Sequence, residues 1–372
     1  MPWVNQDTHG PAPLPAHGHT ATLLGATHER SKLVVFGGQG EDNAVLGETH
    51  VLELGTWTWS HVQANGPDAV HPPRRAFHTA TAIEANRIFL FGGVATRNDA
   101  EELYYFNDTW LFVDEDRCWS EVEVAGAAPE GRAAHTACLL ESSGRRTVAI
   151  FGGTNGQKPF DDLWLLHIQS SSSSWQAKWE QVQLKGSFNK PLGRSYHCAA
   201  VVGDTMLVWG GVRPGKDEGC IVSAGDNVHL FSLARRTWSL ELVDERLVSG
   251  PRSSCTAIAH GGKVLIVGGK LTTATACRAN GGRDRTEGCL LFDMAGRKWL
   301  PPPDVGADPR ALRSGHSSTL VSSPSPRMLL LGGYLGNKQA SGRPLGGGAE
   351  AGRTGAPGRS TRAVPRTPAP RP

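Results

Sequence analysis

Short apolar runs that end in a glycine pair recur along the chain. The first run, Leu33 to Phe36, is followed directly by Gly37 and Gly38. Later pairs follow at a mean step of about 59 residues, longer than a helical hairpin needs and close to the period of a four-stranded propeller blade. Glycine at a strand end tolerates positive φ and lets another chain pass closely. The later pairs are Gly92 and Gly93, Gly152 and Gly153, Gly210 and Gly211, Gly268 and Gly269, and Gly332 and Gly333.

Each repeat is predicted to contain four strands. In the repeat that opens at Arg132, a strand of small and apolar residues precedes the apolar run 147–151, and two more strands are expected over 161–166 and 179–182. Near-continuous apolar second strands indicate burial on both faces, as in a sheet between two other sheets. The fourth strand of a repeat carries a tryptophan, which we interpret as a plug between sheets. These tryptophans are Trp59, Trp119, Trp179, Trp238 and Trp299.

The repeats resemble the kelch family of β-propellers. An Arg-x-x-His start, the glycine pair and the downstream tryptophan recur together from about Trp3 to Tyr334. The resemblance implies an all-β, six-bladed propeller of four-stranded blades over residues 1–335, and it implies a structural role for the repeat residues. Two starts depart from the pattern: Cys255 stands where histidine is expected, and Ala16 stands where His19 should have its arginine.

Composition fits such a ring. Many glycines and prolines suit short strands joined by turns, and one ring accommodates the whole length as a single domain. The start of the chain lacks a basic segment followed by an apolar one, and no apolar run reaches the ~20 residues that span a bilayer. Seven cysteines without a Cys-x-x-Cys motif indicate a reducing compartment. We therefore expect a cytoplasmic protein, with the nucleus as a second compartment.

Residues 336–372 are predicted to form a disordered tail rich in glycine, proline and arginine, because they contain few large apolar groups. The segment Arg362 to Pro368 matches a weak SH3-type ligand pattern, for which a plain linker is the alternative. Basic residues concentrate in this tail, so the ring is mildly acidic and nucleic acid is an improbable partner.

The last blade is expected to be incomplete. Its first two strands end at Gly332 and Gly333, and no third strand of the usual kind follows. The spacing of Trp3 from His19 predicts that the N-terminus supplies the fourth strand. Three arrangements stay open: a truncated or alternatively joined chain, direct pairing of the N-terminal strand with the second strand, or a partner strand in the gap.

A catalytic site is not predicted. Histidines at one repeat position raise a metal-ring hypothesis, but side chains of the first strands should point between blades rather than toward the axis. We predict no cofactor, no metal and no enzyme activity. The alternative is a kelch enzyme that acts on a sugar or a glucosinolate-derived molecule at the channel mouth.

The predicted function is protein–protein interaction, as a scaffold or adaptor, through loops on one face of the ring. The loops between second and third strands are long and should emerge together. One carries an acidic lip beside aromatic residues, which commonly anchor interfaces, and another is basic. The candidate contact residues are Asp99, Glu101, Glu102, Tyr104 and Tyr105 in the first loop, and Lys270, Arg278, Arg283 and Arg285 in the second. The partner is predicted to be an intracellular protein; neither its identity nor the oligomeric state follows from the sequence.

Overall fold

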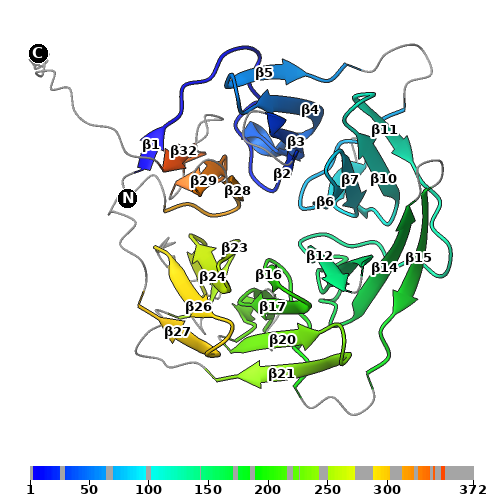
Figure 1. Ribbon diagram of the computed structural model, residues 1–372, viewed down its shortest axis with the longest axis vertical. Helices are drawn as coiled ribbons and strands as arrows, with labels where there is room; N and C mark the ends of the chain where they lie inside the picture. The colour runs from blue at the N-terminus through cyan, green and yellow to red at the C-terminus, as the bar shows by residue number, and fades with distance from the viewer. Residues whose placement is uncertain are drawn as a thin grey trace, which may run out of the picture.

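The chain folds into a ring of β-sheets around a central axis (Figure 1). The computed structural model describes residues 3–25, 30–63, 70–97, 102–142, 144–170, 175–184, 189–215, 221–225, 227–242, 250–272, 288–301, 312–321, 326–335, 338–339 and 345–347. Over these residues the regular structure is β-strand, apart from the short 3-10 helix η2 (Glu41–Asn43). The structure therefore confirms an all-β propeller.

Five four-stranded antiparallel sheets are each built from strands of one repeat, and we call them blades 1 to 5. Blade 1 contains β2 (Thr20–Leu24), β3 (Lys32–Gln39), β4 (Val45–Glu53) and β5 (Thr58–His61). Blade 2 contains β6 (Thr79–Glu84), β7 (Arg87–Phe91), β10 (Thr109–Val113) and β11 (Cys118–Glu121). Blade 3 contains β12 (Thr136–Ser142), β13 (Arg145–Phe151), β14 (Leu163–Ser170) and β15 (Trp175–Gln181). Blade 4 contains β16 (Cys198–Val202), β17 (Thr205–Trp209), β20 (Val228–Ser232) and β21 (Thr237–Glu241). Blade 5 contains β23 (Thr256–His260), β24 (Lys263–Val267), β26 (Leu290–Asp293) and β27 (Lys298–Leu300).

A further four-stranded sheet joins the two ends of the chain, and we call it the composite sheet. Its strand order is β1 (Trp3–Asn5), β32 (Leu345–Gly347), β29 (Arg327–Leu331) and β28 (Ser317–Val321). Strand β32 pairs with both β1 and β29, so the N-terminal strand is fourth in the sheet, as predicted. Direct pairing of that strand with the second strand is wrong, because β32 lies between them.

Strand β32 also corrects the predicted tail. Composition predicts disorder from residue 336 onward, yet residues 338–339 pair with 334–335, and the backbone groups of residues 345–347 complete the ladder between β1 and β29. An open strand edge gains from pairing with any nearby backbone, including one with few large side chains. The third strand of the last sheet is therefore present in this chain, and residues 348–372, with the SH3-type pattern, lie outside the described residues.

Glycine pairs let neighbouring sheets approach closely. In every pair both glycines have positive φ, and a Cβ on Gly92 would lie 2.6 Å from the carbonyl oxygen of Arg132 in the next blade. The amide of the second glycine donates to that same carbonyl, as Gly93 does to Arg132 at 2.8 Å. Gly333 of the composite sheet likewise donates to Ala16 of blade 1 at 2.9 Å. The contact thus continues across the junction of the chain ends.

The core lies between the sheets and is built around the repeat tryptophans. Trp119 of blade 2 packs on Phe36 of blade 1, with ring centroids 5.3 Å apart. Trp238 of blade 4 packs on Phe151 of blade 3 at the same 5.3 Å. Where the composite sheet meets blade 5, Trp3 lies in a buried cluster with Val267. Edge-on aromatic contacts of this kind add to the free energy gained by burial.

Candidate interaction face

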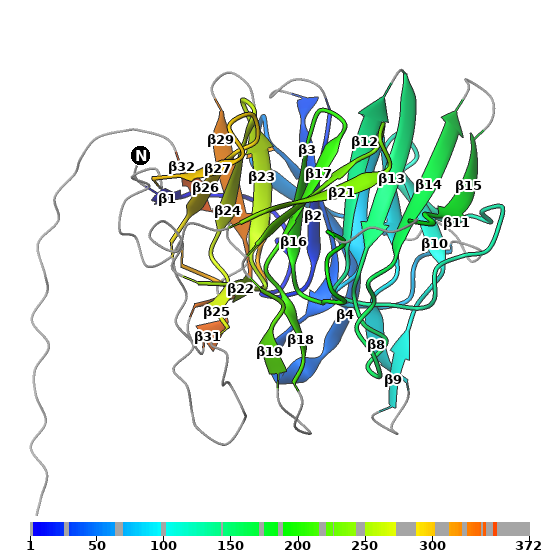
Figure 2. The same cartoon turned by 90° about the horizontal axis from the view of Figure 1, so that it is seen from below.

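The second and third strands of the repeats are joined by extended hairpins that project from one end of the ring (Figure 2). These are β8 (Val94–Arg97) with β9 (Glu102–Tyr105), β18 (Val212–Pro214) with β19 (Ile221–Ser223), and β30 (Tyr334–Leu335) with β31 (Lys338–Gln339). In blade 5, β25 (Lys270–Leu271) pairs instead with β22 (Arg252–Ser253). We call this end the hairpin face and the opposite end, which contains the turns 85–86, 114–117 and 233–236, the turn face.

Large apolar side chains are exposed on the hairpin face. Leu103 and Tyr104 on β9 are 57% and 43% exposed, and Ile221 on β19 is 44% exposed. Leu14 and Leu192 occupy one repeat position, two residues before the Ala16 and Arg194 starts, and are also exposed. The other exposed large hydrophobics among the described residues, Val70 and Leu242, lie in connections between sheets. Exposed apolar side chains that gather on one face indicate an interaction surface.

A closed ring of backbone hydrogen bonds surrounds the axis at this face. Each amide donates to the carbonyl of the equivalent residue in the preceding sheet, over 2.7 to 3.0 Å. All of these residues have positive φ, between 55° and 65°. Glycine adopts that conformation freely, whereas other residues are strained by ~1 kcal/mol. The ring consists of Gly18, Phe77, Ala134, Tyr196, Ser254 and Gly315.

Aromatic side chains form a collar over part of this ring. Phe77 contacts Tyr196 edge-on, with centroids 5.4 Å apart, and His17 contacts Phe77 at 5.6 Å. His17 also contacts Tyr334, with centroids 4.4 Å apart. Burial raises the pKa of Tyr196 and lowers the pKa of His17. Phe77 and Tyr196 keep large rings at strained positions where glycine would fit, which is a pattern typical of functional surfaces.

Beneath the collar lies a cavity of about 210 Å³ lined by the repeat histidines. The Nε2 atom of each histidine is bonded to a hydroxyl on the preceding sheet, for example His135 to Thr79 Oγ1 at 2.8 Å. Burial lowers the pKa of His135 and of His316 to about 3, and that of His19 to about 4. These histidines are therefore neutral links between sheets. They are His19, His78, His135, His197 and His316.

One link in this series is different. Cys255 replaces the histidine of blade 5, and its partner position in blade 4 is Cys198 instead of threonine. Both thiols are buried and free. A side-chain hydrogen bond with Cys255, together with burial, raises the pKa of Cys198. The cysteine pair thus substitutes for a histidine–threonine link and leaves the contact uncharged.

Only some of the predicted contact residues can be placed. Tyr104 is exposed on β9, and Tyr105 beside it is partly buried, with its hydroxyl 2.8 Å from the position of a Cβ on Gly156 in blade 3. Glu102 is exposed on the same strand. Lys270 lies on β25 of blade 5, across the ring from blade 2 (Figure 1), so Glu102 and Lys270 do not lie together. Asp99, Glu101, Arg278, Arg283 and Arg285 lie outside the described residues.

Sequence reasoning missed the collar. Its members Phe77 and Tyr196 directly precede the repeat histidines, at the second variable position of the Arg-x-x-His start. An aromatic residue at a position where another repeat has Gly315 is the signal that could have revealed it.

The fold, the repeat contacts and the glycine pairs together define a kelch-type β-propeller. The chain matches the family model of the KLHDC2/KLHL20/DRC7 Kelch-repeats domain over residues 1–176 and 104–333. The chain belongs to the kelch-repeat family.

Several curated proteins share this similarity. The chain is 29% identical to the dynein alpha chain of the flagellar outer arm from Chlamydomonas reinhardtii, over 82% of its own length and 6% of that protein. It is 30% identical to human host cell factor 2, over 53% of its length and 25% of that protein. It is 29% identical to bovine Kelch domain-containing protein 3, over 58% of its length and 53% of that protein. The chain thus spans about half or less of the length of these relatives. In addition, no helix among the described residues is long and apolar enough to cross a membrane.

Proposed function

We propose that this protein is a non-catalytic scaffold or adaptor that binds an intracellular protein partner through the hairpin face. The observation that carries the proposal is the exposure of Leu103, Tyr104 and Ile221 on the hairpins that project from this face. Aromatic and aliphatic side chains that are exposed before binding become the buried centre of an interface. The matched kelch-repeat family agrees with a binding role.

The centre of the proposed site is the collar with the adjacent β9 strand. Tyr104 packs edge-on against Phe106, with centroids 4.9 Å apart, so its ring is held in place before a partner arrives. A side chain that is already ordered loses little conformational freedom on binding. Tyr104 and Leu103 are therefore proposed as anchors, and Glu102, Tyr105 and Lys270 as surrounding contacts.

Site-specific photo-crosslinking tests this function. A photoreactive amino acid at position 104 should yield defined crosslinked species in cells, whereas the same group at the exposed turn-face residue Glu115 should not. Replacing Leu103 and Ile221 by serine should remove the crosslinks made from position 104. The proposal fails if both positions yield the same crosslinked proteins.

We also propose that the composite sheet closes the ring as a sixth blade. The histidine, glycine and tryptophan contacts on both of its sides follow the repeat pattern. Hydrogen exchange of the isolated chain tests this closure: amides of residues 327–331 should be strongly protected, and rapid exchange would show that the sheet needs a partner strand.

A further inference from the structure

Blade 1 lacks the positively charged arginine side chain that other blades have at the equivalent repeat position. In blade 2, the buried Arg75 donates from Nη1 to the carbonyl oxygen of Gly92 at 3.0 Å and forms two 2.7 Å bonds with the carboxylate of Asp108. Trp110 Nε1 donates to the same carboxylate at 2.8 Å. Blade 3 repeats the arrangement with Arg132, Asp162 and Trp164. An arginine, a carboxylate and a tryptophan thus form a repeated unit.

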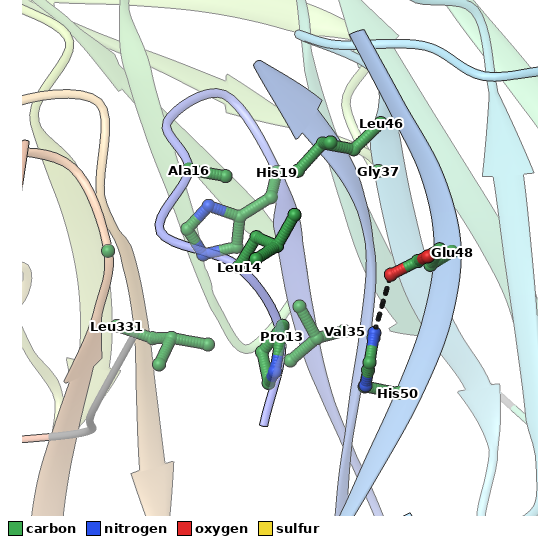
Figure 3. Close-up of a pocket in the computed structure, with 11 residues that line it drawn as sticks. Pro13, Leu14, Ala16, His19, Val35, Gly37, Leu46, Glu48, His50 and Leu331 are labelled. Carbon is green, nitrogen blue, oxygen red and sulfur yellow. Dashed lines mark hydrogen bonds and ion pairs between the residues drawn. The ribbon is translucent and has the colours of Figure 1, made fainter. Parts of the chain in front are cut away.

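In blade 1 the equivalent residues are Ala16, Glu48 and His50. The carboxylate is kept, but the arginine is replaced by alanine and the tryptophan by histidine. A small cavity of about 20 Å³ lies there, and its lining includes Ala16, Gly37 and Glu48, the counterparts of Arg75, Gly92 and Asp108 (Figure 3). Blade 1 thus keeps a cavity where the guanidinium would lie and a carboxylate that would accept its hydrogen bonds, but it lacks the positive charge.

The hydrogen bonds of His50 also call for a cation. Its Nδ1 atom lies 3.1 Å from the carbonyl oxygen of Pro11. A carbonyl oxygen only accepts, so Nδ1 carries a proton, and in the neutral ring Nε2 presents a lone pair. That lone pair faces Glu48 Oε2, another acceptor, at 3.1 Å. Two acceptors at this distance are stable only with a proton or a metal ion between them.

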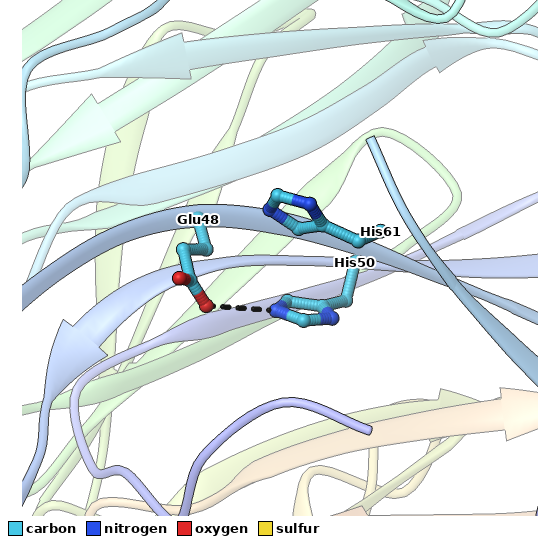
Figure 4. A group of neighbouring side chains, drawn as sticks. All are labelled: Glu48, His50 and His61. Atoms are coloured by element: carbon cyan, nitrogen blue, oxygen red, sulfur yellow. Dashed lines mark hydrogen bonds and ion pairs between the residues drawn. The ribbon is translucent and has the colours of Figure 1, made fainter. Parts of the chain in front are cut away.

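A second imidazole completes the group. His61 on β5 pairs directly with His50 on β4 in the sheet register, and Glu48 lies two residues from His50, so all three side chains are on one face of blade 1 (Figure 4). The imidazole centroids of His50 and His61 are 5.0 Å apart. One ligand atom from each of the three residues lies within 4.8 Å of the others. Glu48 and His61 are exposed and can close that distance by small side-chain rotations.

We propose that Glu48, His50 and His61 form a binding site for a divalent transition-metal ion, with Zn²⁺ as the ion that the ligand set fits best. Two imidazoles and one carboxylate match the nitrogen and oxygen ligands of zinc at ~2.0–2.2 Å. The Pro11 carbonyl orients the His50 ring in the way that outer-shell acceptors orient zinc-bound histidines. Three protein ligands leave the fourth tetrahedral position for water or for a side chain of a binding partner.

Metal titration of the full chain tests this site. Purified, chelator-treated protein should bind one Zn²⁺ per chain, measured by competition with a chromophoric chelator, and should give the visible spectrum of tetrahedral Co²⁺ when cobalt is used instead. His61→Ala and Glu48→Gln should each raise the dissociation constant at least tenfold. His61 is exposed, so its variant should fold normally, which a thermal melt would verify.

The matched control is His167 of blade 3. Its Nε2 atom is bonded to Glu180 Oε2 at 2.7 Å, but this pair is not part of a three-ligand group among the described residues. His167→Ala should leave zinc affinity unchanged. Absence of stoichiometric binding would overturn the proposal and show that a proton bridges Glu48 and His50. Equal loss of affinity in the His167 and His61 variants would also overturn it.

A complementary variant restores the missing cation. Ala16→Arg should place a guanidinium beside Glu48 and lower zinc affinity at least tenfold, while the chain still folds. Retention of full zinc affinity in a folded Ala16→Arg variant would place the metal somewhere other than Glu48 and would overturn the proposed ligand set.

Discussion

The hairpin face and the turn face of the ring are built from the same repeats but expose different chemistry. At the hairpin face, buried arginines and neutral histidines support irregular hairpins that expose Leu103, Tyr104 and Ile221. Among the described residues, the short turns at the other end expose polar and charged groups and are linked by ion pairs between blades, such as Arg117 with Glu53 at 3.0 Å. Repetition fixes the scaffold at both ends, and the proposed partner site uses the departures from the repeat at the hairpin face.

Lowering the pH should destabilise the hairpin face more than the turn face, and this is the largest effect that we predict. The folded-state pKa values of His19, His135 and His316, at about 3 to 4, lie below the unfolded value of about 6.5. These histidines make their full contribution to the free energy of unfolding above pH 6.5. That contribution is lost as the pH falls toward the folded-state pKa, since the unfolded state then binds protons that the folded state does not. From pH 7.5 to 5.5 the free energy of unfolding should decrease by about 4 kcal/mol for the three together.

Urea denaturation at both pH values measures this loss, and hydrogen exchange should show faster opening at the hairpin face. An unfolding free energy that is constant between the two pH values would contradict the assignment of neutral, buried histidines.

Replacing a buried arginine by alanine should lower the free energy of unfolding more than replacing a partly exposed one. Arg132 is fully buried and forms two bonds with Asp162, so Arg132→Ala leaves that carboxylate uncompensated and should cost about 3 kcal/mol. Arg117 on the turn face is partly exposed, and Arg117→Ala should cost less than ~1 kcal/mol. Chemical denaturation of both variants checks the contrast, and equal losses would mean that the two faces are held by similar interactions.

Replacing the Cys198–Cys255 contact by the threonine–histidine contact of the other blades should be tolerated only when both residues are changed. Cys198→Thr together with Cys255→His restores the hydroxyl–imidazole contact seen in other blades and should change stability by about 1 kcal/mol or less. Cys255→His alone places an imidazole against a thiol and should destabilise more than the pair does. A double-mutant cycle measures this coupling, and strict additivity would show that the two positions do not interact.

The smallest expected effect on stability is at the proposed anchors. Tyr104→Ser should change the free energy of unfolding by less than ~0.5 kcal/mol, because the residue is exposed, while it reduces partner crosslinking from neighbouring positions. A large loss of stability would show that Tyr104 supports the hairpin fold rather than a binding surface.

The sequence predicted most of the scaffold, because glycine pairs, apolar second strands and tryptophans repeat with a fixed order. It did not predict β32, since residues 345–347 pair through backbone groups that carry no sequence signal. The collar and the Glu48, His50 and His61 group were also missed. The collar departs from the repeat in blades 2 and 4, and the Glu48, His50 and His61 group departs from it in blade 1. Such departures gain meaning only when the neighbouring strands place them together.

The ring of left-handed residues at the hairpin face limits how the channel can change. Because every member is bonded to the members before and after it, widening the mouth would break several backbone bonds at once. The mouth of the cavity beneath the collar therefore has a fixed backbone diameter, and only the side chains on its rim can alter its opening.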